Sequence, residues 1–251
     1  MSDCCMETKE QKETAGTGIR PAKRIQTSIL NGVERKALVW MAERMPRWVT
    51  SDMLSGVGVA GAIIIAAGYM LANVNINWLW LSSFGFVVHW FGDSMDGSLA
   101  RVRHTQRPVY GFYLDHTLDA VTEFIMFFGA GMSSLLRLDI AMMVFVAYLL
   151  MTLNVTINSH LKSEFRLTYA KLGPTEFRVL MIILNTLLIY VAPLREFSTT
   201  LCYFEHSLTL SGLDVVALCI FVVIMVIYVC TVVSDTRGYA KADPLPKAPK
   251  A

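Results

Sequence analysis

The sequence predicts an all-α integral membrane protein with six transmembrane helices and an N-terminal amphipathic helix in the membrane interface. Of its 251 residues, 54% are hydrophobic and only 17% are charged, whereas a soluble domain usually carries about a quarter charged residues. The hydrophobic residues gather in runs of the length that a membrane-spanning helix needs, about 20 residues. Composition and run length together therefore favour a multi-pass helical protein.

Six apolar runs qualify as spans, at roughly 53–72, 77–95, 112–135, 139–158, 176–193 and 212–233. Before them, residues 25–47 mix aliphatic side chains with arginine and lysine, which is typical of a helix that lies in the membrane interface. The six-span domain is therefore expected over 48–235. The polar segments 1–24 and 236–251 are expected to be disordered tails, and the first lacks the apolar core of a signal peptide.

Lysine and arginine are distributed unevenly among the segments that connect the spans, and this bias predicts orientation. If the N-terminus is cytoplasmic, six spans return the C-terminus to the cytoplasm. The cytoplasmic side then carries most of the basic residues, including Arg101, Arg103 and Arg107, whereas the opposite side carries only Arg137 and Arg195. We therefore expect both termini in the cytoplasm, in the cell inner membrane if the organism is bacterial.

Other motifs do not support a different class of protein. The net charge of +2 is too small to indicate a nucleic-acid partner. Gly56, Gly58 and Gly61 spell G-x-G-x-x-G, but a dinucleotide site needs a strand before this motif. Because these glycines lie in an apolar run, we interpret them as small residues that let two helices pack closely.

Four aspartates lie near the ends of the second and third spans. Asp93 and Asp96 are three residues apart and Asp115 and Asp119 are four apart, so each pair shares one helix face. The four carboxylates can converge near the cytoplasmic surface, where they would repel one another unless paired. Divalent cations with oxygen ligands remove that cost, and two such metals suit phosphoryl chemistry. Pairing with the neighbouring arginines would account for two of these aspartates but not for four.

These residues form the pattern D-x-x-D-G-x-x-A-R, followed after nine residues by G-x-x-x-D-x-x-x-D. The pattern resembles the signature of the CDP-alcohol phosphotransferase family, and the resemblance covers the six-span core, about 45–235. All eight fixed letters are present, as Asp93, Asp96, Gly97, Ala100, Arg101, Gly111, Asp115 and Asp119. The resemblance implies a six-span fold, often dimeric, that transfers a phosphoalcohol group from a CDP-alcohol to a hydroxyl, with release of CMP, in phospholipid biosynthesis.

The resemblance also implies roles for single residues. Mg²⁺ or Mn²⁺ in a two-metal site would be held by Asp93, Asp96 and Asp115, with Asp119 close by. Either Asp119 or His116 would be the general base. The nucleotide would lie against Asp96, Gly97, Ala100, Arg101 and Gly111. Asp52 stands near a turn that contributes to the nucleotide site in the family, and capping of a helix is an equal alternative for it.

The acceptor is left open by the sequence. The segments that contain His116 and Glu176 resemble the corresponding segments of the choline/ethanolamine branch of the family. Phe112, however, stands where that branch has a glutamate. Arg178 could bind an anionic acceptor such as glycerol or inositol phosphate, pair with Glu176, or extend to the interface. The lipid could be the donor, as CDP-diacylglycerol, or the acceptor, as diacylglycerol.

A lipid or small-molecule transporter and an inactive structural membrane protein are the alternative classes. A transporter would more often show repeated halves with broken helices, and the sequence has no internal repeat. An inactive protein would be expected to have lost at least one of the eight motif letters. We therefore expect an enzyme in which a base deprotonates the acceptor hydroxyl and the oxygen attacks the β-phosphorus of the CDP-alcohol. Its expected partners are the CDP-alcohol donor, a lipid or alcohol acceptor, membrane lipids and a second copy of the chain.

Overall fold

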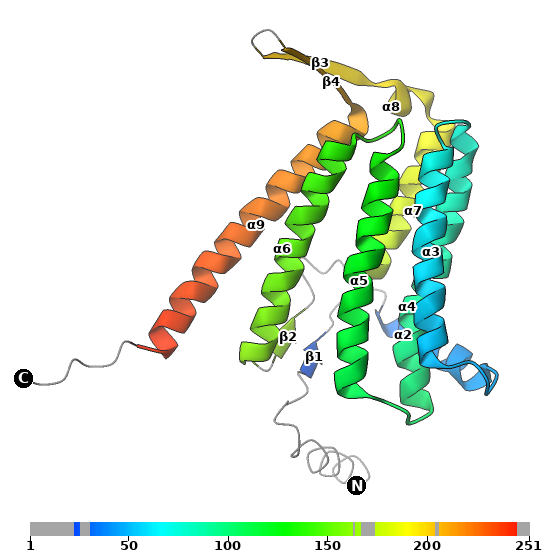
Figure 1. The fold of residues 1–251 in the computed structure, drawn as a ribbon, viewed down its shortest axis with the longest axis vertical. Helices are drawn as coiled ribbons and strands as arrows, with labels where there is room; N and C mark the ends of the chain where they lie inside the picture. The colour runs from blue at the N-terminus through cyan, green and yellow to red at the C-terminus, as the bar shows by residue number, and fades with distance from the viewer. Residues whose placement is uncertain (1–22, 26–30, 163, 167–173, 204–205, 245–251) are drawn as a thin grey trace, which may run out of the picture.

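The computed structural model describes residues 23–25, 31–162, 164–166, 174–203 and 206–244. They form a bundle of long helices with a small two-stranded sheet at each end (Figure 1). The helices are α2 (Asn31–Arg44), α3 (Ser51–Leu71), α4 (Leu79–Val102), α5 (Pro108–Gly131), α6 (Leu138–Lys162), α7 (Pro174–Tyr190), α8 (Ala192–Glu196) and α9 (Gly212–Ala242), with a 3-10 helix η2 (Ile76–Trp78) before α4. The strands are β1 (Lys23–Ile25), β2 (Glu164–Arg166), β3 (Ser198–Tyr203) and β4 (His206–Ser211).

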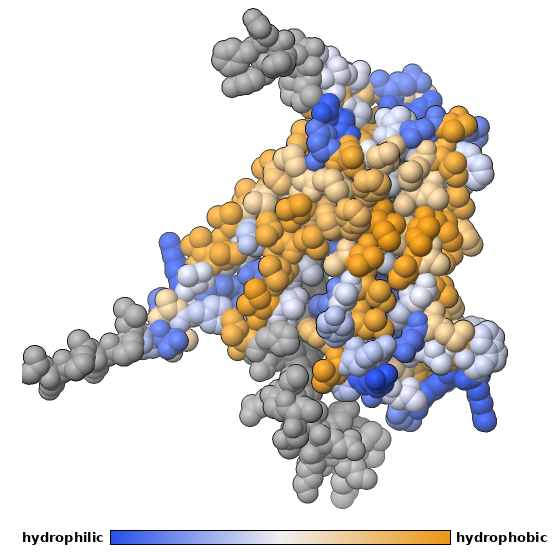
Figure 2. Space-filling view, in the orientation of Figure 1, coloured by the Kyte–Doolittle hydropathy of each residue, from blue (hydrophilic) through white to orange (hydrophobic). Residues whose placement is uncertain are grey.

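Each predicted span coincides with one long helix, namely α3, α4, α5, α6, α7 or α9. Within the described part of the chain, three helices are long and apolar enough to cross a membrane, judged by length and composition alone. They are α3, the segment Leu138–Ser159 of α6, and α9. Helices α4 and α5 carry aspartates, and α7 has 17 residues, which is short for a span of about 20. Figure 2 shows apolar side chains across the middle of the bundle and hydrophilic ones gathered at its two ends.

The prediction of an all-α chain is correct for the bundle and wrong for the segments at its ends. β3 and β4 pair as an antiparallel hairpin, and β1 pairs with β2 in parallel. These strands have three to six residues, so a search for long apolar runs does not detect them. Strand β4 alternates serine or threonine with larger residues, and β3 opens with Ser198, Thr199 and Thr200; threonine is among the residues that favour strands.

The helix predicted over 25–47 is observed as α2, which begins at Asn31 and ends at Arg44, just before Pro46. Part of the predicted N-terminal segment is strand β1 instead, and residues 1–22 and 26–30 lie outside the described part.

At the other end of the chain, α9 continues to Ala242, so the boundary predicted at residue 235 is too early. Two hydrogen bonds hold this extension against α6. Asn158 donates to Asp235 at 2.8 Å, and the Tyr239 hydroxyl donates to Asn158 at 2.6 Å. The sequence of this part is polar but contains no proline before Pro244, so the helix can continue to that point. Residues 245–251 of the predicted tail lie outside the described part.

Small residues bring α3 and α4 together. The closest approaches are those of Gly61 to the backbone of His89, Gly68 to that of Ser82, and Gly92 to that of Gly58. A Cβ atom at Gly61, Gly68 or Gly92 would overlap the backbone of the facing helix, so only glycine permits this helix separation. The interpretation of the G-x-G-x-x-G motif as a packing surface is therefore confirmed for Gly58 and Gly61, whereas Gly56 faces open space.

Buried polar contacts add α7 to this pair of helices. The Tyr69 hydroxyl of α3 donates to Asn185 Oδ1 at 2.9 Å, and Asn185 Nδ2 donates to the Ser83 hydroxyl of α4 at 3.2 Å. Asn185 is completely buried, and in an apolar bundle such bonds between side chains fix helix register. Helices α3, α4 and α7 therefore form one unit that holds the site described below.

We predict that Gly68→Ala destabilises the bundle, because the added methyl group would meet the backbone of Ser82. Overpacking of this kind typically costs about 1–3 kcal/mol. Thermal unfolding of the purified protein in detergent measures the effect. Gly56→Ala on the same helix is the matched control, since a Cβ there meets nothing within 4 Å. Equal melting temperatures for the two variants would contradict the proposed contact.

Candidate active site

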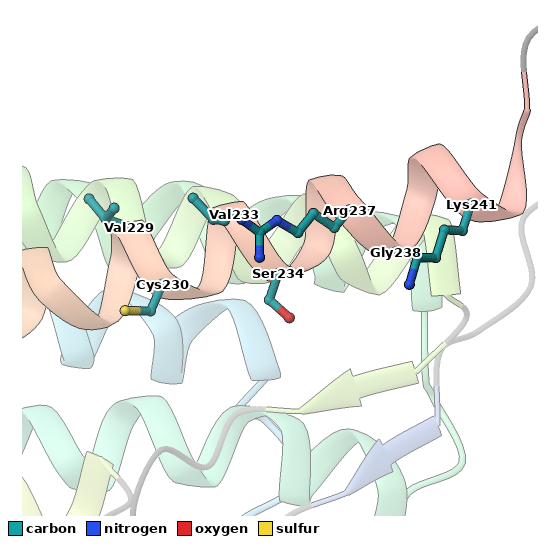
Figure 3. A pocket seen from close by; sticks show the side chains of 7 residues that line it. All are labelled: Val229, Cys230, Val233, Ser234, Arg237, Gly238 and Lys241. Carbon is teal, nitrogen blue, oxygen red and sulfur yellow. The ribbon is translucent and has the colours of Figure 1, made fainter.

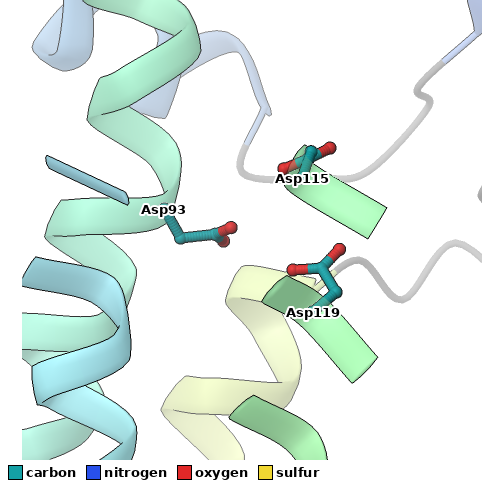
Figure 4. A group of neighbouring side chains, drawn as sticks. All are labelled: Asp93, Asp115 and Asp119. Carbon is teal, nitrogen blue, oxygen red and sulfur yellow. The ribbon is translucent and has the colours of Figure 1, made fainter. Parts of the chain in front are cut away.

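Three of the four predicted aspartates converge between α4 and α5. Asp93 comes from α4 and Asp115 and Asp119 from α5, and each presents a carboxylate oxygen within 4.8 Å of the other two. Figure 4 shows the three side chains directed toward one another across the gap between the helices. The spacing of four residues places Asp115 and Asp119 on one face of α5, as the sequence predicts. Like charges at this separation require a cation or a proton between them.

Asp96 lies at the edge of this group rather than within it. Its Oδ2 accepts a hydrogen bond of 2.6 Å from the Ser55 hydroxyl of α3, and its Oδ1 accepts from the Gly97 backbone N–H. Asp96 nevertheless lines the same small cavity as Asp93, Asp115 and Asp119. The structure thus brings all four predicted carboxylates to one cavity and groups three of them tightly.

Three helices form the walls of the cavity. Its lining, besides the aspartates, consists of Ser55, Gly58 and Val59 from α3, His89 from α4, and Leu118 and Thr122 from α5. Sequence analysis missed Leu118 and Thr122, although they follow Asp115 and Asp119 by three residues and therefore share their helix face. Close contact between α3 and α4 at Gly58 brings Ser55 within reach of Asp96.

Arg178 of α7 reaches this cluster and forms a hydrogen-bonded ion pair with Asp93, from Nη2 to Oδ2. Both side chains are mostly buried, with 13% and 25% of their surfaces exposed. Of the alternatives raised by the sequence, the structure favours a position beside the carboxylates over extension to the interface. Glu176 lies two residues earlier on α7 and is half-buried.

The arginines near the motif have other contacts. Arg103 donates to the backbone carbonyls of Met45, Pro46 and Val49, and so attaches the connection between α2 and α3 to the end of α4. The Arg107 guanidinium lies 3.9 Å from the centre of the Tyr110 ring. The pairing of Arg178 with Asp93 was not among the alternatives that the sequence offered for this arginine, which named Glu176 as its possible ion-pair partner.

His116 is turned along its own helix. Its ring centre lies 4.1 Å from that of Phe112, and its Nδ1 is 3.0 Å from the Phe112 carbonyl oxygen, to which it must donate because a carbonyl only accepts. His116 is not among the described residues that line the cavity, whereas Asp119 is. His116 nevertheless stays close to the cluster, with its Nδ1 3.9 Å from Asp115 Oδ2.

The residues predicted to contact a nucleotide lie close to the aspartates in the sequence. Gly97 and Ala100 are half-buried, Arg101 donates to the Ser98 hydroxyl at 3.0 Å, and Gly111 is exposed. Asp52 is exposed at the start of α3, where Thr50 rather than Asp52 caps the helix and Tyr110 donates to Asp52 at 3.4 Å. Apart from Asp96, none of these residues belongs to the described lining of the small cavity.

A larger groove of about 510 Å³ lies on α9, away from the aspartates. Figure 3 shows its lining as one stripe of the helix: Val229, Cys230, Val233, Ser234, Arg237, Gly238 and Lys241. The stripe passes from apolar to basic toward the C-terminus, as is typical where a helix leaves the hydrocarbon region and its cations reach the interface. It contains none of the predicted site residues, so we attribute it to the membrane boundary of α9.

Most of the helical bundle, including the four aspartates, lies within a segment that matches a known protein family. The profile of the family described as CDP-alcohol phosphatidyltransferase matches residues 48–233. Over 86 residues the chain is 34% identical to a protein named phosphatidylinositol phosphate synthase from Cutibacterium acnes. That alignment covers 34% of this chain and 38% of the relative, so it relates only part of each protein to the other.

We predict that Asp115→Asn weakens Mn²⁺ binding to the purified protein by tenfold or more, because it removes one of three clustered negative charges. Even loss of a supporting group commonly costs about 10–100-fold in metal affinity. Titration followed by electron paramagnetic resonance measures free Mn²⁺ without any substrate. Asp243→Asn is the control, since Asp243 is exposed beyond the end of α9. Equal affinities for the two variants would refute the assignment.

Proposed function

This chain belongs to the CDP-alcohol phosphatidyltransferase family, and we propose that it transfers a phosphatidyl or similar phosphoalcohol group from a CDP-alcohol to a hydroxyl, releasing CMP. Family membership and three apolar helices make it an integral membrane protein of phospholipid biosynthesis. The observation that carries the proposal is the convergence of Asp93, Asp115 and Asp119. These residues belong to the motif that resembles the family signature, and the mutual approach of their carboxylate oxygens to within 4.8 Å supports a shared role.

We assign Mg²⁺ or Mn²⁺ to this cluster, with Asp96 completing a two-metal site. The donor set fits, because the grouped atoms in the described part are all carboxylate oxygens, which hard divalent cations prefer. Bound there, such metals neutralise the pyrophosphate of the donor and stabilise the leaving CMP. Ser55, which already donates to Asp96, would keep that carboxylate oriented.

Asp119 is the proposed general base. It takes the proton of the acceptor hydroxyl, the oxygen forms a bond to the β-phosphorus, and the bond from that phosphorus to the bridging oxygen breaks. The electron pair of the broken bond leaves with CMP. Val59 and Leu118 line the cavity beside Asp119, and apolar walls of this kind limit access of water, which would otherwise hydrolyse the donor.

The position of Arg178 supports the proposal that the acceptor is anionic. Its guanidinium lies beside Asp93, where a phosphate on the acceptor could bind through two parallel hydrogen bonds. Partial similarity to a phosphatidylinositol phosphate synthase favours the same interpretation, with the lipid as CDP-diacylglycerol and a phosphorylated polyol as acceptor. Glu176 remains a predicted acceptor contact.

We further propose six spans with both termini in the cytoplasm. The six long helices alternate in direction along the bundle (Figure 1). The end of α4 that carries the aspartates and the basic end of α9, with Arg237 and Lys241, would then share the cytoplasmic side. Arg137 and Arg195 would lie at the opposite side, where the β3–β4 hairpin also lies. A homodimer is proposed on the family resemblance alone.

A substrate panel tests the function. We expect purified protein with Mg²⁺ or Mn²⁺ to release CMP from CDP-diacylglycerol when inositol phosphate or glycerol phosphate is added, and EDTA to abolish the reaction. Activity in EDTA would overturn the metal assignment. Turnover of diacylglycerol with a CDP-amino alcohol would overturn the anionic acceptor, and no CMP release from any pair would favour a transporter or an inactive protein.

We predict that Arg178→Lys raises the KM of the acceptor by roughly ten- to a hundredfold, because lysine cannot copy the paired hydrogen bonds of a guanidinium. The KM of the CDP-alcohol should change little. Initial rates of CMP release with each substrate varied in turn separate the two constants. Arg195→Lys is the matched control, since Arg195 pairs with exposed Glu196 beyond α7. An unchanged acceptor KM would refute the role of Arg178.

A further inference from the structure

Glu34 of α2 connects three helices through one carboxylate oxygen. Its Oε1 accepts hydrogen bonds from the Trp90 indole at 2.7 Å, from the Thr175 hydroxyl at 2.8 Å and, more weakly, from the Ser94 hydroxyl at 3.5 Å. Trp90 and Ser94 belong to α4, and Thr175 belongs to the first turn of α7. The donors lie 56, 60 and 141 residues from Glu34 in the sequence, so no local pattern indicates the contact.

These contacts lie next to the ion pair between α4 and α7. Trp90 precedes Asp93 by three residues, and Thr175 precedes Arg178 by three residues. A separation of three residues keeps two side chains on the same part of a helix surface. Glu34 therefore fixes the turn of α4 before Asp93 and the turn of α7 before Arg178 with respect to each other.

The chemistry of the contact suits a positioning role. A carboxylate that accepts from neutral donors forms stronger bonds than a neutral acceptor does, and half-buried surroundings strengthen them further. The first turn of α7 has unpaired backbone N–H groups and the positive end of the helix dipole. A negative charge beside Thr175 therefore stabilises the part of α7 that precedes Arg178.

We propose that Glu34 is a positioning residue that sets the separation of Asp93 and Arg178, and thereby the place of the acceptor relative to the metal-binding aspartates. The inference rests on the proposed function for its kinetic consequence. Glu34 lies outside the segment that matches the family, residues 48–233, and is not part of the motif. Its effect on the reaction passes through the two helices that it joins.

The test compares four variants and one control variant with the wild-type chain. Glu34→Ala removes the shared acceptor, Thr175→Val removes the donor on α7, and the third variant combines both. Glu34→Gln keeps an oxygen that can accept. Glu43→Ala is the matched control, because Glu43 is exposed on the same helix.

We expect Glu34→Ala to raise the KM of the anionic acceptor by about tenfold, comparable to the loss of one charged hydrogen bond to the acceptor, with the KM of CDP-diacylglycerol nearly unchanged. Thr175→Val should act in the same direction, and the double variant should be no worse than Glu34→Ala, because Glu34→Ala already removes the contact between Glu34 and Thr175. Glu34→Gln should restore most of the acceptor affinity, and Glu43→Ala should behave as wild type. Additive effects, or equal rises in both KM values, would overturn the proposal.

A second measurement needs no substrate. Hydrogen exchange of residues 174–180 should be faster in Glu34→Ala and Thr175→Val than in wild type and Glu43→Ala, because the first turn of α7 loses its contact with α2. If the wild type releases no CMP with any acceptor, the proposed function fails, whereas this exchange experiment still decides whether Glu34 holds α7. Unchanged exchange in both variants would show that Glu34 does not position α7.

Discussion

Three aspartate carboxylates within 4.8 Å of one another impose the constraint on which the rest of the bundle depends. If all three were ionised with no cation between them, two unit charges at that separation would repel by roughly 3 kcal/mol at an effective dielectric constant of about 20. Three such pairs would approach the whole stability of a typical domain. The fold must therefore hold the helices together by other contacts and supply the cluster with a cation or a proton.

Both requirements are met at the end of the bundle that holds the cluster. Arg178 supplies a cation from α7 to Asp93. Arg103 attaches the connection between α2 and α3 to α4. The Ser55 hydroxyl donates a hydrogen bond to the Asp96 carboxylate. Because apolar side chains gain little from each other in lipid, close packing and polar contacts must provide the association. The glycines of α3 and α4 allow the close packing, and the side chains of Arg178, Arg103 and Ser55 provide the polar contacts.

Local spacing made much of this arrangement predictable. Residues three or four apart on a helix share a face whatever the tertiary structure, so Asp115 and Asp119 could be placed together from the sequence. Asp93 could be placed near them because the two aspartate pairs lie at the ends of adjacent spans joined by a short loop. The six helices also followed from run length. Both inferences use only helix geometry and the thickness of a bilayer.

Contacts that depend on a side-chain rotamer or on a distant partner could not be predicted in this way. His116 turns toward Phe112, a choice between rotamers that spacing does not determine. The extension of α9 depends on Asn158, 77 residues before Asp235. The hairpin of β3 and β4 was missed because its strands are shorter than any run sought in the hydropathy pattern.

The aspartates of the motif and the residues on α7 have different proposed roles in the reaction. We propose that the aspartates of the motif hold the metals that stabilise the leaving CMP, a role that does not depend on the acceptor. The acceptor, by contrast, is proposed to bind at Arg178 of α7, and the first turn of that helix contacts Glu34 of α2 through Thr175. Discrimination between acceptors requires differences in binding free energy of a few kcal/mol. A displacement of the first turn of α7 relative to the fixed carboxylates would supply such differences without changing the motif. On these proposals, acceptor choice in this chain resides in α7 and in α2, which contacts its first turn, and the reaction type resides in α4 and α5.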